Sequence, residues 1–266
     1  MKSYQYIGEE TMVFNQKLKP YAVLVIATLA VILLQHYASN WMYQRSFDLY
    51  PIYKGIDPDR AFMHYFLHHL MQIVMYIILI VVIKKMLQMR FCDFGFNFKN
   101  AKVSLQYSLF FILLWTIIQF GGGYLSLLGG QQYNLNFIAN KRNLTGYILF
   151  QGLLSGTSEE IFYRGFLVAV TLRMMQGYVK KTKNLYIITT IVSIVVFMAG
   201  HIDFTLVPFK ITYIDVFQQL TTICVSIFYC ITFFRTKSLL GPILMHNVLN
   251  CVVTFTVLLL NAISKG

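Results

Sequence analysis

The sequence predicts an all-α fold, a polytopic membrane helix bundle of about seven transmembrane helices, with six to eight as the expected range. Composition is the first reason. Of 266 residues, 57% are hydrophobic and only 12% are charged, whereas a soluble globular protein carries about 25% charged residues. The mean hydropathy of +0.61 is the second reason. Too few polar side chains remain to cover a compact fold in water, so the lipid bilayer is the expected solvent.

The third reason is the set of long apolar runs. A helix that crosses a bilayer needs about 20 mostly apolar residues, and seven runs meet that length. They are expected at residues 20–38, 61–83, 104–122, 145–172, 184–201, 215–234 and 239–261. These runs leave no room for a soluble domain.

The first and third runs lie in an N-terminal region, residues 1–140, that carries no recognised motif. The first run follows Lys17, Lys19 and Pro20, and no small-x-small cleavage site comes after it. It is therefore predicted to stay as a helix rather than to be removed as a secretory signal. The third run ends in a glycine run, 121–123, which together with Gly129 and Gly130 is predicted to mark one flexible extramembrane segment.

The second run begins with three histidines, His64, His68 and His69, beside Tyr65 and Phe66. A spacing of four places His64 and His68 on one helix face, as two metal ligands would require. No carboxylate is near them in sequence. A belt of aromatic and histidine side chains at the membrane interface is therefore favoured, and a metal site is the alternative.

The basic residues orient the predicted spans. Lys and Arg outnumber Asp and Glu by 22 to 10, and they lie in short segments between the apolar runs. Fourteen of them fall on the side of the N-terminal tail and seven on the other side. The positive-inside rule then predicts a cytoplasmic N-terminus and, for seven spans, a C-terminus outside. Anionic lipid headgroups explain this charge, and no basic stretch is long enough to bind nucleic acid.

The fourth run carries the strongest functional signal. Glu159 and Glu160 are the acidic pair deep in an apolar run, about 21 Å along a helix starting near residue 145. One such charge costs about 2.5–3.5 kcal/mol, so two carboxylates and Arg164 in one span require a reason. Glu160 and Arg164 share a helix face and are expected to pair, whereas Glu159 points about 100° away. A purely structural Glu160–Arg164 pair is the alternative, and it leaves Glu159 unexplained.

Two further runs supply candidate partners for Glu159. His201 ends the fifth run, and His246 and Asn250 share one face of the seventh. Taken singly, an interfacial histidine or an interhelical asparagine is the plainer interpretation. Together these groups suit amide hydrolysis, because one can serve as general base and others as fixed donors to an oxyanion. Gly152 and Gly156 have the spacing that lets another helix approach closely.

These residues resemble three motifs of the CPBP family, the CAAX-protease and bacteriocin-processing (Abi) family of intramembrane proteases. Residues 159–165, Glu-Glu-Ile-Phe-Tyr-Arg-Gly, are similar to its Glu-Glu-x-x-x-Arg motif. Residues 197–201 are similar to its Phe-x-x-x-His motif, and residues 246–250 to its His-x-x-x-Asn motif. The resemblance covers about residues 145–255 and implies a catalytic helix core within residues 141–266.

The resemblance implies two residues for activating the attacking water, two for stabilising the tetrahedral oxyanion and two for holding the site together. These pairs are Glu159 with His201, His246 with Asn250, and Glu160 with Arg164. The cofactor stays open: Glu159, His201 and His246 would be the ligands if zinc is used. The sequence lacks His-Glu-x-x-His, so a metal-free water is favoured.

The predicted function is therefore an intramembrane endopeptidase that hydrolyses a peptide bond in a membrane-associated protein or peptide. One alternative is a non-catalytic scaffold or bacteriocin self-immunity protein of the same fold. A less favoured alternative is a proton-coupled transporter that uses both glutamates as a relay. The expected partners are the substrate and the lipid bilayer, without nucleic acid. Short loops and the lack of eukaryotic targeting signals favour a bacterial plasma membrane.

Overall fold

The computed structural model describes residues 2–265, with side chains from Leu18 onward. Lys2 and Lys17, which contribute to the predicted orientation, have side chains outside this described part. The chain divides into two compact units, each of which is described by itself. Unit 1 consists of Met1–Tyr37 and Leu167–Ser226, and unit 2 consists of Ala38–Phe166 and Ile227–Gly266.

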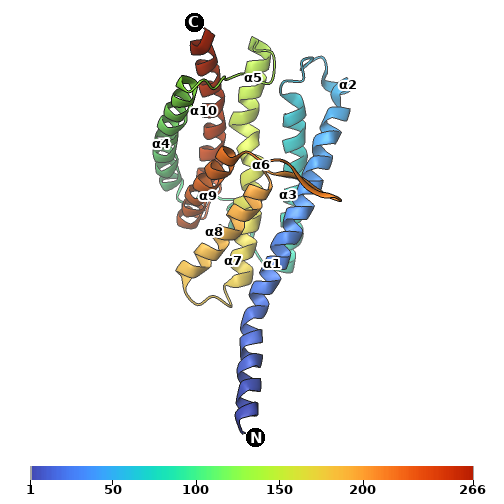
Figure 1. The fold of residues 1–266 in the computed structure, drawn as a ribbon, viewed down its shortest axis with the longest axis vertical. Helices are drawn as coiled ribbons and strands as arrows, with labels where there is room; N and C mark the ends of the chain where they lie inside the picture. Colours follow the sequence, from blue (N-terminus) through green and yellow to red (C-terminus); the bar gives the residue numbers. More distant parts are fainter. Residues whose placement is uncertain (1, 266) are drawn as a thin grey trace. The chain divides into compact units, whose positions relative to one another are not determined.

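Six helices in the described part of the chain are long and apolar enough to cross a membrane, which confirms the polytopic helical fold. Each of them covers one of the predicted runs. They are α1 (Lys2–Asp48, with its span from Leu18), α3 (Met63–Met86), α4 (Ala101–Leu128), α8 (Thr182–Ala199), α9 (Val216–Thr236) and α10 (Leu240–Lys265) (Figure 1).

The remaining predicted span, 145–172, forms a longer helical run of unequal segments (Figure 1). In chain order these are α5 (Lys141–Phe150), a π-helical segment (Gln151–Ser155), α6 (Gly156–Glu160), a second π-helical segment (Ile161–Val168) and α7 (Ala169–Met175). The side chain of Asn140 accepts a hydrogen bond from the Asn143 backbone and so caps α5. π-Helical turns are rare in proteins overall, but those that do occur often lie at functional sites. Here they flank the segment that ends in both glutamates.

A buried carboxylate begins α3. Between α2 (Tyr50–Tyr53) and α3, the side chain of Asp57 accepts hydrogen bonds at 2.8 Å from the backbone nitrogens of Ala61, Phe62 and Met63. These nitrogens are among the donors that a helix start leaves without partners, and the helix dipole also favours a negative charge there. Asp57 can therefore be buried without a basic partner.

Hydrogen bonds between connections define two opposite ends of unit 2. At one end, Ser238, before α10, donates to the backbone oxygen of Asn97, before α4, at 2.6 Å. At the other end, Asp59 accepts from Arg142 at 2.7 Å and from Asn143 at 2.9 Å. The Asn143 hydrogen bond, with help from Arg142, holds the pKa of Asp59 below its ordinary value. Both ends of the bundle are thus fixed by polar contacts between distant parts of the sequence.

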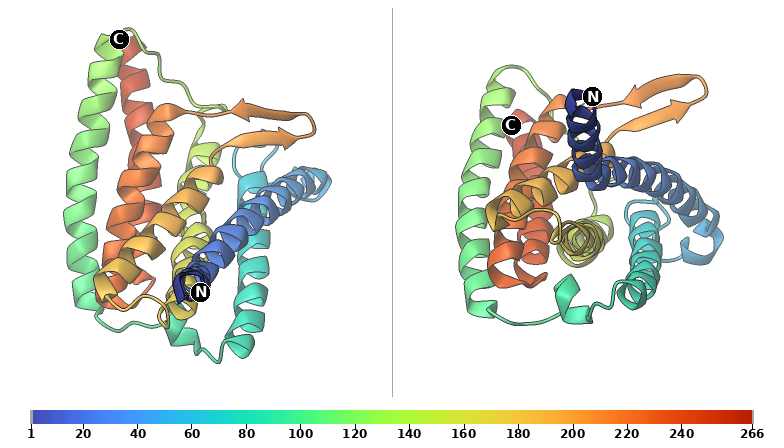
Figure 2. Two further views of the ribbon diagram at one scale, coloured as in Figure 1. Left: turned by 60° about the horizontal axis from the view of Figure 1, so that its bottom comes forward. Right: turned by 90° about the horizontal axis from the view of Figure 1, so that it is seen from below.

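Helix α10 packs along α4, as the red and green helices show in Figure 2 (left). A Cβ on Gly123 would lie 2.8 Å from Leu260 Cδ1 and 3.3 Å from Thr256 Cγ2, so the glycine permits this approach. Of the glycines predicted to lie in one flexible segment, Gly129 and Gly130 lie in the turn after α4, and the prediction was wrong for residues 121–123. They belong to α4, because glycine in a membrane helix often serves close packing rather than chain reversal.

The three histidines of α3 are buried inside unit 2. His64, His68 and His69 keep 4%, 8% and 9% of their surface exposed. The His64 ring stacks on Phe47, and His68 Nε2 lies 3.5 Å from Ser39 Oγ. Residues 38–48 of α1 therefore cover this face of α3. The position of these rings at the membrane interface stays a prediction, and residue spacing did not reveal that α1 covers them.

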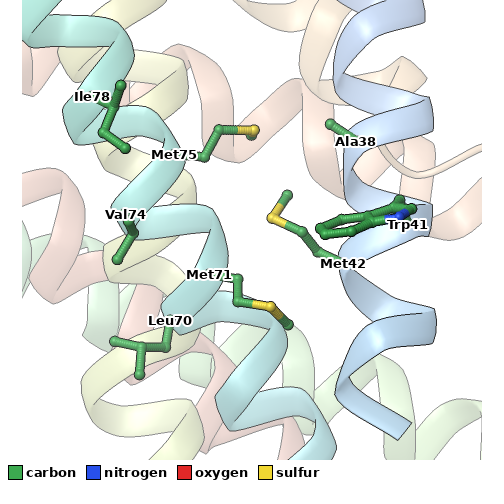
Figure 3. A pocket seen from close by; sticks show the side chains of 8 residues that line it. All are labelled: Ala38, Trp41, Met42, Leu70, Met71, Val74, Met75 and Ile78. Carbon is green, nitrogen blue, oxygen red and sulfur yellow. The ribbon is translucent and has the colours of Figure 1, made fainter. Parts of the chain in front are cut away.

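An apolar groove of about 480 Å³ lies between α1 and α3 of unit 2 (Figure 3). Trp41 and Met42 line it from α1, and Met71 and Met75 lie among the residues that line it from α3. All lining side chains are apolar apart from the indole nitrogen of Trp41. None of the predicted site residues lines this groove.

Unit 1 contains a β-hairpin that the sequence did not predict. Strands β1 (Asp203–Leu206) and β2 (Phe209–Tyr213) pair antiparallel in the connection between α8 and α9. The ring of His36, from α1, stacks on Phe204 with 4.0 Å between centroids. The strands are rich in aromatic and β-branched residues, as β-strands usually are. Strands of four and five residues are much shorter than a membrane span, so the hydropathy pattern does not reveal them.

Candidate active site

The candidate active site lies where α6 and α10 of unit 2 meet. Glu159 and Glu160 end α6, and His246 lies six residues after the start of α10, about 9 Å along its axis. The sequence placed the glutamates near the middle of a span and His246 near the end of another. The structure nevertheless brings them together, with His246 Nδ1 2.8 Å from Glu160 Oε1, although the run that contains the glutamates extends from Lys141 to Met175.

Gly156 explains how the two helices come so close. A Cβ on Gly156 would lie 2.7 Å from His246 Cβ and 2.7 Å from Asn247 Oδ1, nearer than real Cβ contacts. A Cβ on Gly152 would lie 3.4 Å from Cys251 Sγ, an ordinary contact. Of the two glycines with the predicted packing spacing, Gly156 is therefore the one that α10 approaches most closely.

Glu160 is the centre of a buried charge network. Its Oε1 accepts hydrogen bonds from Arg164 Nη1 and from His246 Nδ1, both at 2.8 Å. The side chains of Glu160 and Arg164 are fully buried, and the guanidinium carbon lies 5.0 Å from the centre of the Tyr229 ring. The ion pair expected from the spacing of four is present. The same carboxylate also orients the imidazole of His246.

Glu159 faces the other nitrogen of that imidazole. Its Oε2 lies 3.6 Å from His246 Nε2, and its side chain keeps 22% of its surface exposed. Because Nδ1 donates to Glu160, Nε2 carries a hydrogen only in the imidazolium form of His246. The carboxylate of Glu159 is thus placed to contact whichever group occupies the space next to Nε2, while Glu160 is paired with the guanidinium of Arg164.

Asn250 lies one turn beyond His246 and contacts the glutamate helix rather than the carboxylates. Its amide nitrogen donates to Ser155 Oγ at 3.0 Å. The amide of Asn247 donates to Thr157 Oγ1 at 3.1 Å. An asparagine amide has two N–H donors, so one donor of Asn250 remains for another acceptor.

His201 belongs to unit 1, where it follows the end of α8. Its Nδ1 donates to the backbone oxygen of Phe197 at 2.9 Å, and its ring lies edge-on to the Phe197 ring. The amide of Gln219 donates to the His201 backbone oxygen at 3.2 Å. These contacts fix the tautomer, so the neutral imidazole presents Nε2 as an acceptor. The Phe-x-x-x-His spacing thus has a local meaning, because Phe197 orients His201.

The structure therefore gathers most of the predicted site residues in unit 2. Four of them form one network of charged side chains. Asn250 lies one helical turn beyond His246 on α10, and His201 lies in unit 1. The four are Glu159, Glu160, Arg164 and His246.

Sequence reasoning missed the contacts that hold this network from outside the motifs. His69 Nδ1 is hydrogen-bonded to Ser158 Oγ, and the Tyr229 ring lies 5.5 Å from the His246 ring. The only signal for His69 was a polar side chain within an apolar run, which marks a membrane residue that needs a partner. Its partner, Ser158, stands directly before Glu159.

The donor types of the three candidate zinc ligands, one carboxylate and two imidazoles, are those of a catalytic zinc site. Glu159 and His246 lie together in unit 2, and His201 lies in unit 1. Among the side chains of residues 18–265, no group of three or more His, Cys, Asp or Glu stands close enough together to hold a metal.

Residues 141–252 match the family of type II CAAX prenyl endopeptidases described as Rce1-like. A search of curated proteins and a search of solved structures found no match. The matched segment runs from the start of α5 to the middle of α10, so it contains all three motifs.

Proposed function

We propose that this chain, whose residues 141–252 match the CPBP family, is an intramembrane endopeptidase acting on a membrane-associated protein or peptide. At family level this is a CAAX-type intramembrane protease, and its six long apolar helices make it an integral membrane protein. One observation carries the proposal for this chain: the His246 imidazole is held between Glu159 and Glu160 inside an apolar bundle.

Glu159 is the proposed general base. Its side chain keeps 22% of its surface exposed against 0% for Glu160, and the Oε2 atoms of both carboxylates have no hydrogen-bond partner among the described residues. Glu159 can therefore accept a proton from a water molecule, whereas Glu160 already accepts from Arg164 and His246. His201 is the proposed second acceptor for that water, through Nε2. The activated water would attack the peptide carbonyl, and Glu159 would pass the proton to the leaving amine.

His246 and Asn250 are the proposed donors to the tetrahedral oxyanion. His246 Nδ1 donates to Glu160, and in the imidazolium form Nε2 carries a second hydrogen that can be donated to the oxyanion. Asn250 keeps one amide hydrogen beyond its bond to Ser155. Such donors act most strongly in a site from which bulk water is excluded, and losing one typically costs about 10²–10³ in kcat. Glu160 and Arg164 would hold His246 in place.

We propose that the water is activated without a metal ion. The sequence has no His-Glu-x-x-His pattern, and the carboxylate of Glu159 can serve as the base for a water molecule by itself. In many zinc enzymes, a histidine ligand donates the ring N–H that does not face the metal to a carboxylate, as His246 Nδ1 donates to Glu160 here. Metal dependence therefore needs a measurement of its own.

Location and substrate complete the proposal. The proposed setting is a bacterial plasma membrane, from the short loops and the lack of eukaryotic targeting signals, with the N-terminus in the cytoplasm, from the distribution of Lys and Arg. The proposed substrate is a protein or peptide anchored in the same membrane. A scaffold or self-immunity protein of this fold would need the helices but not the acid and base groups. A transporter would need the glutamates to move protons across the membrane.

The decisive experiment compares membrane peptides, by mass spectrometry, from cells with wild-type protein and with Glu159→Gln protein. Products that depend on Glu159 are expected to disappear while the amount of protein in the membrane stays unchanged. Asp48→Asn is the matched control, since Asp48 forms an exposed ion pair with Arg45 at the end of α1. Full activity of purified Glu159→Gln would refute the mechanism, and an unchanged phenotype would favour the scaffold.

Two further measurements separate the remaining alternatives. Dialysis of purified protein against a chelator is expected to leave cleavage unchanged, and loss of cleavage that added zinc restores would refute the metal-free proposal. In liposomes with a pH gradient, no proton-coupled flux is expected. A flux abolished by Glu159→Gln would favour the transporter.

A further inference from the structure

We propose that His69 on α3 is a positioning residue of the active site, an inference that rests on the proposed function. Helix α3 lies outside the segment that matches the family, so no motif assigns it a role. His69 is nine-tenths buried, and its Nδ1 is hydrogen-bonded to Ser158 Oγ. Ser158 is fully buried and immediately precedes Glu159, the proposed base.

The direction of this hydrogen bond follows from the hydroxyl group. A serine hydroxyl has one hydrogen, and that of Ser158 points to the backbone oxygen of Ser155 at 2.9 Å. Ser158 Oγ must then accept from His69, so His69 carries its hydrogen on Nδ1. Two hydrogen bonds in series therefore join α3 to the end of the first π-helical segment: one from His69 Nδ1 to Ser158 Oγ, and one from Ser158 Oγ to the backbone oxygen of Ser155.

This link completes a set of contacts around the four residues before Glu159, which we name the 155–158 turn. Helix α10 holds the first three: Asn250 donates to Ser155, His246 packs on Gly156, and Asn247 donates to Thr157. Helix α3 holds the fourth, through His69 and Ser158. Each residue of the turn therefore has a neighbour on another helix.

The contact from α3 differs in kind from the other three. Contacts from one helix leave the 155–158 turn free to rock against that helix, whereas a contact from a second helix removes this freedom. Glu159 is the next residue, and its carboxylate stands 3.6 Å from His246 Nε2. Rocking of the turn would move this carboxylate away from the imidazole and from the bound water. A misplacement of about 1 Å in an active site can cost about 10²-fold in rate.

The neighbouring histidines of α3 provide a matched comparison. His68 is as buried as His69 but approaches Ser39 of α1, and His64 stacks on Phe47 of α1. A buried imidazole in a membrane helix is costly unless it is hydrogen-bonded, so all three need partners. Of these three, His69 is the one whose partner lies in the glutamate helix. A purely structural role would make His68 and His69 equivalent, and a positioning role would not.

The test uses full-length purified protein in detergent and three variants: His69→Leu, His69→Asn and His68→Leu. The probe is a quenched fluorescent peptide that ends in a farnesylated CAAX sequence. His69→Leu is expected to lower kcat about 10- to 100-fold with KM within about twofold, because the base is misplaced but binding is not. His69→Asn keeps an N–H donor near the position of Nδ1 and is expected to recover most of kcat. His68→Leu is expected to stay within about twofold of wild type.

Hydrogen exchange of the peptide that covers residues 151–160 gives a readout independent of catalysis. His69→Leu is expected to speed exchange there, and His68→Leu is not. Equal losses of kcat in His69→Leu and His69→Asn, or equal exchange in His69→Leu and wild type, would overturn the positioning role. If wild-type protein cleaves no peptide, the proposed function fails, and the exchange comparison still decides whether His69 fixes the turn.

Discussion

Gly156→Ala tests the contact on which the site depends. The new methyl carbon would lie 2.7 Å from His246 Cβ, 2.8 Å from His246 Cγ and 2.7 Å from Asn247 Oδ1. Ordinary van der Waals contact begins at 3.4 Å, so α10 must retreat from α6 by about 0.7 Å. The substitution adds only one carbon atom, and that atom lies where α6 and α10 touch.

The expected magnitude follows from the distances in the network. A retreat of about 0.7 Å would lengthen the bond between His246 Nδ1 and Glu160 Oε1 from 2.8 Å to about 3.5 Å, the limit for a hydrogen bond. Overpacking of this kind costs about 1–3 kcal/mol of unfolding free energy. The displaced imidazole is expected to lower kcat about 10- to 100-fold.

The assay measures cleavage and thermal unfolding of purified protein in detergent. Gly152→Ala is the control, because its new methyl carbon would meet Cys251 Sγ at 3.4 Å, an ordinary contact on the same helical run. This control is expected to retain both activity and unfolding temperature. Wild-type activity and stability in Gly156→Ala would refute the reasoning from the close approach of α10.

Two further predictions concern charge. Glu160→Gln is expected to lower the unfolding free energy by about 3–5 kcal/mol, because it leaves Arg164 buried without its carboxylate, whereas Glu159→Gln leaves it nearly unchanged. Equal thermal unfolding of these two variants would contradict the roles given to the glutamates. The Asn143 hydrogen bond holds the pKa of Asp59 in the folded protein below its ordinary value of 3.8. The ionised carboxylate therefore stabilises the fold above pH 3.8, and this stabilisation is lost as the pH falls through the lower pKa of the folded state. At neutral pH, wild type should unfold at a higher temperature than Asp59→Asn. This difference in unfolding temperature should vanish in acid, and a difference that is the same at every pH would contradict the prediction.

Hydropathy predicted the helices well, because a bilayer imposes one length and one composition on every span. The cysteines have no paired spacing in the sequence, which indicates free thiols, and all four are free. Hydropathy did not predict that the fourth span would contain π-helical segments, since no residue type marks them. It missed the hairpin at Asp203–Tyr213, which is shorter than the length on which span prediction depends.

The candidate site was predictable to the extent that it consists of charged groups in apolar runs. The cost of burying Glu160 and Arg164 in a membrane predicted their pairing, and the structure contains that pair. The contact between His246 and Glu160 was not predictable from spacing, because it joins helices 86 residues apart in sequence. The contact between His69 and Ser158 was not predictable for a similar reason. The environment of His69 depends on α1 and α6, and the pattern within α3 does not reveal which helices lie beside it.

The family-matched segment is not a transplantable part of this protein. Residues 141–252 contribute helices to both compact units, and unit 2 also contains α3 and α4 from earlier in the chain. A chimera that exchanged only this segment with a distant homologue would separate Ser158 from His69 and would leave α10 to pack on a foreign α4. Exchanges that respect the architecture would have to carry α3 and α4 along with the motifs.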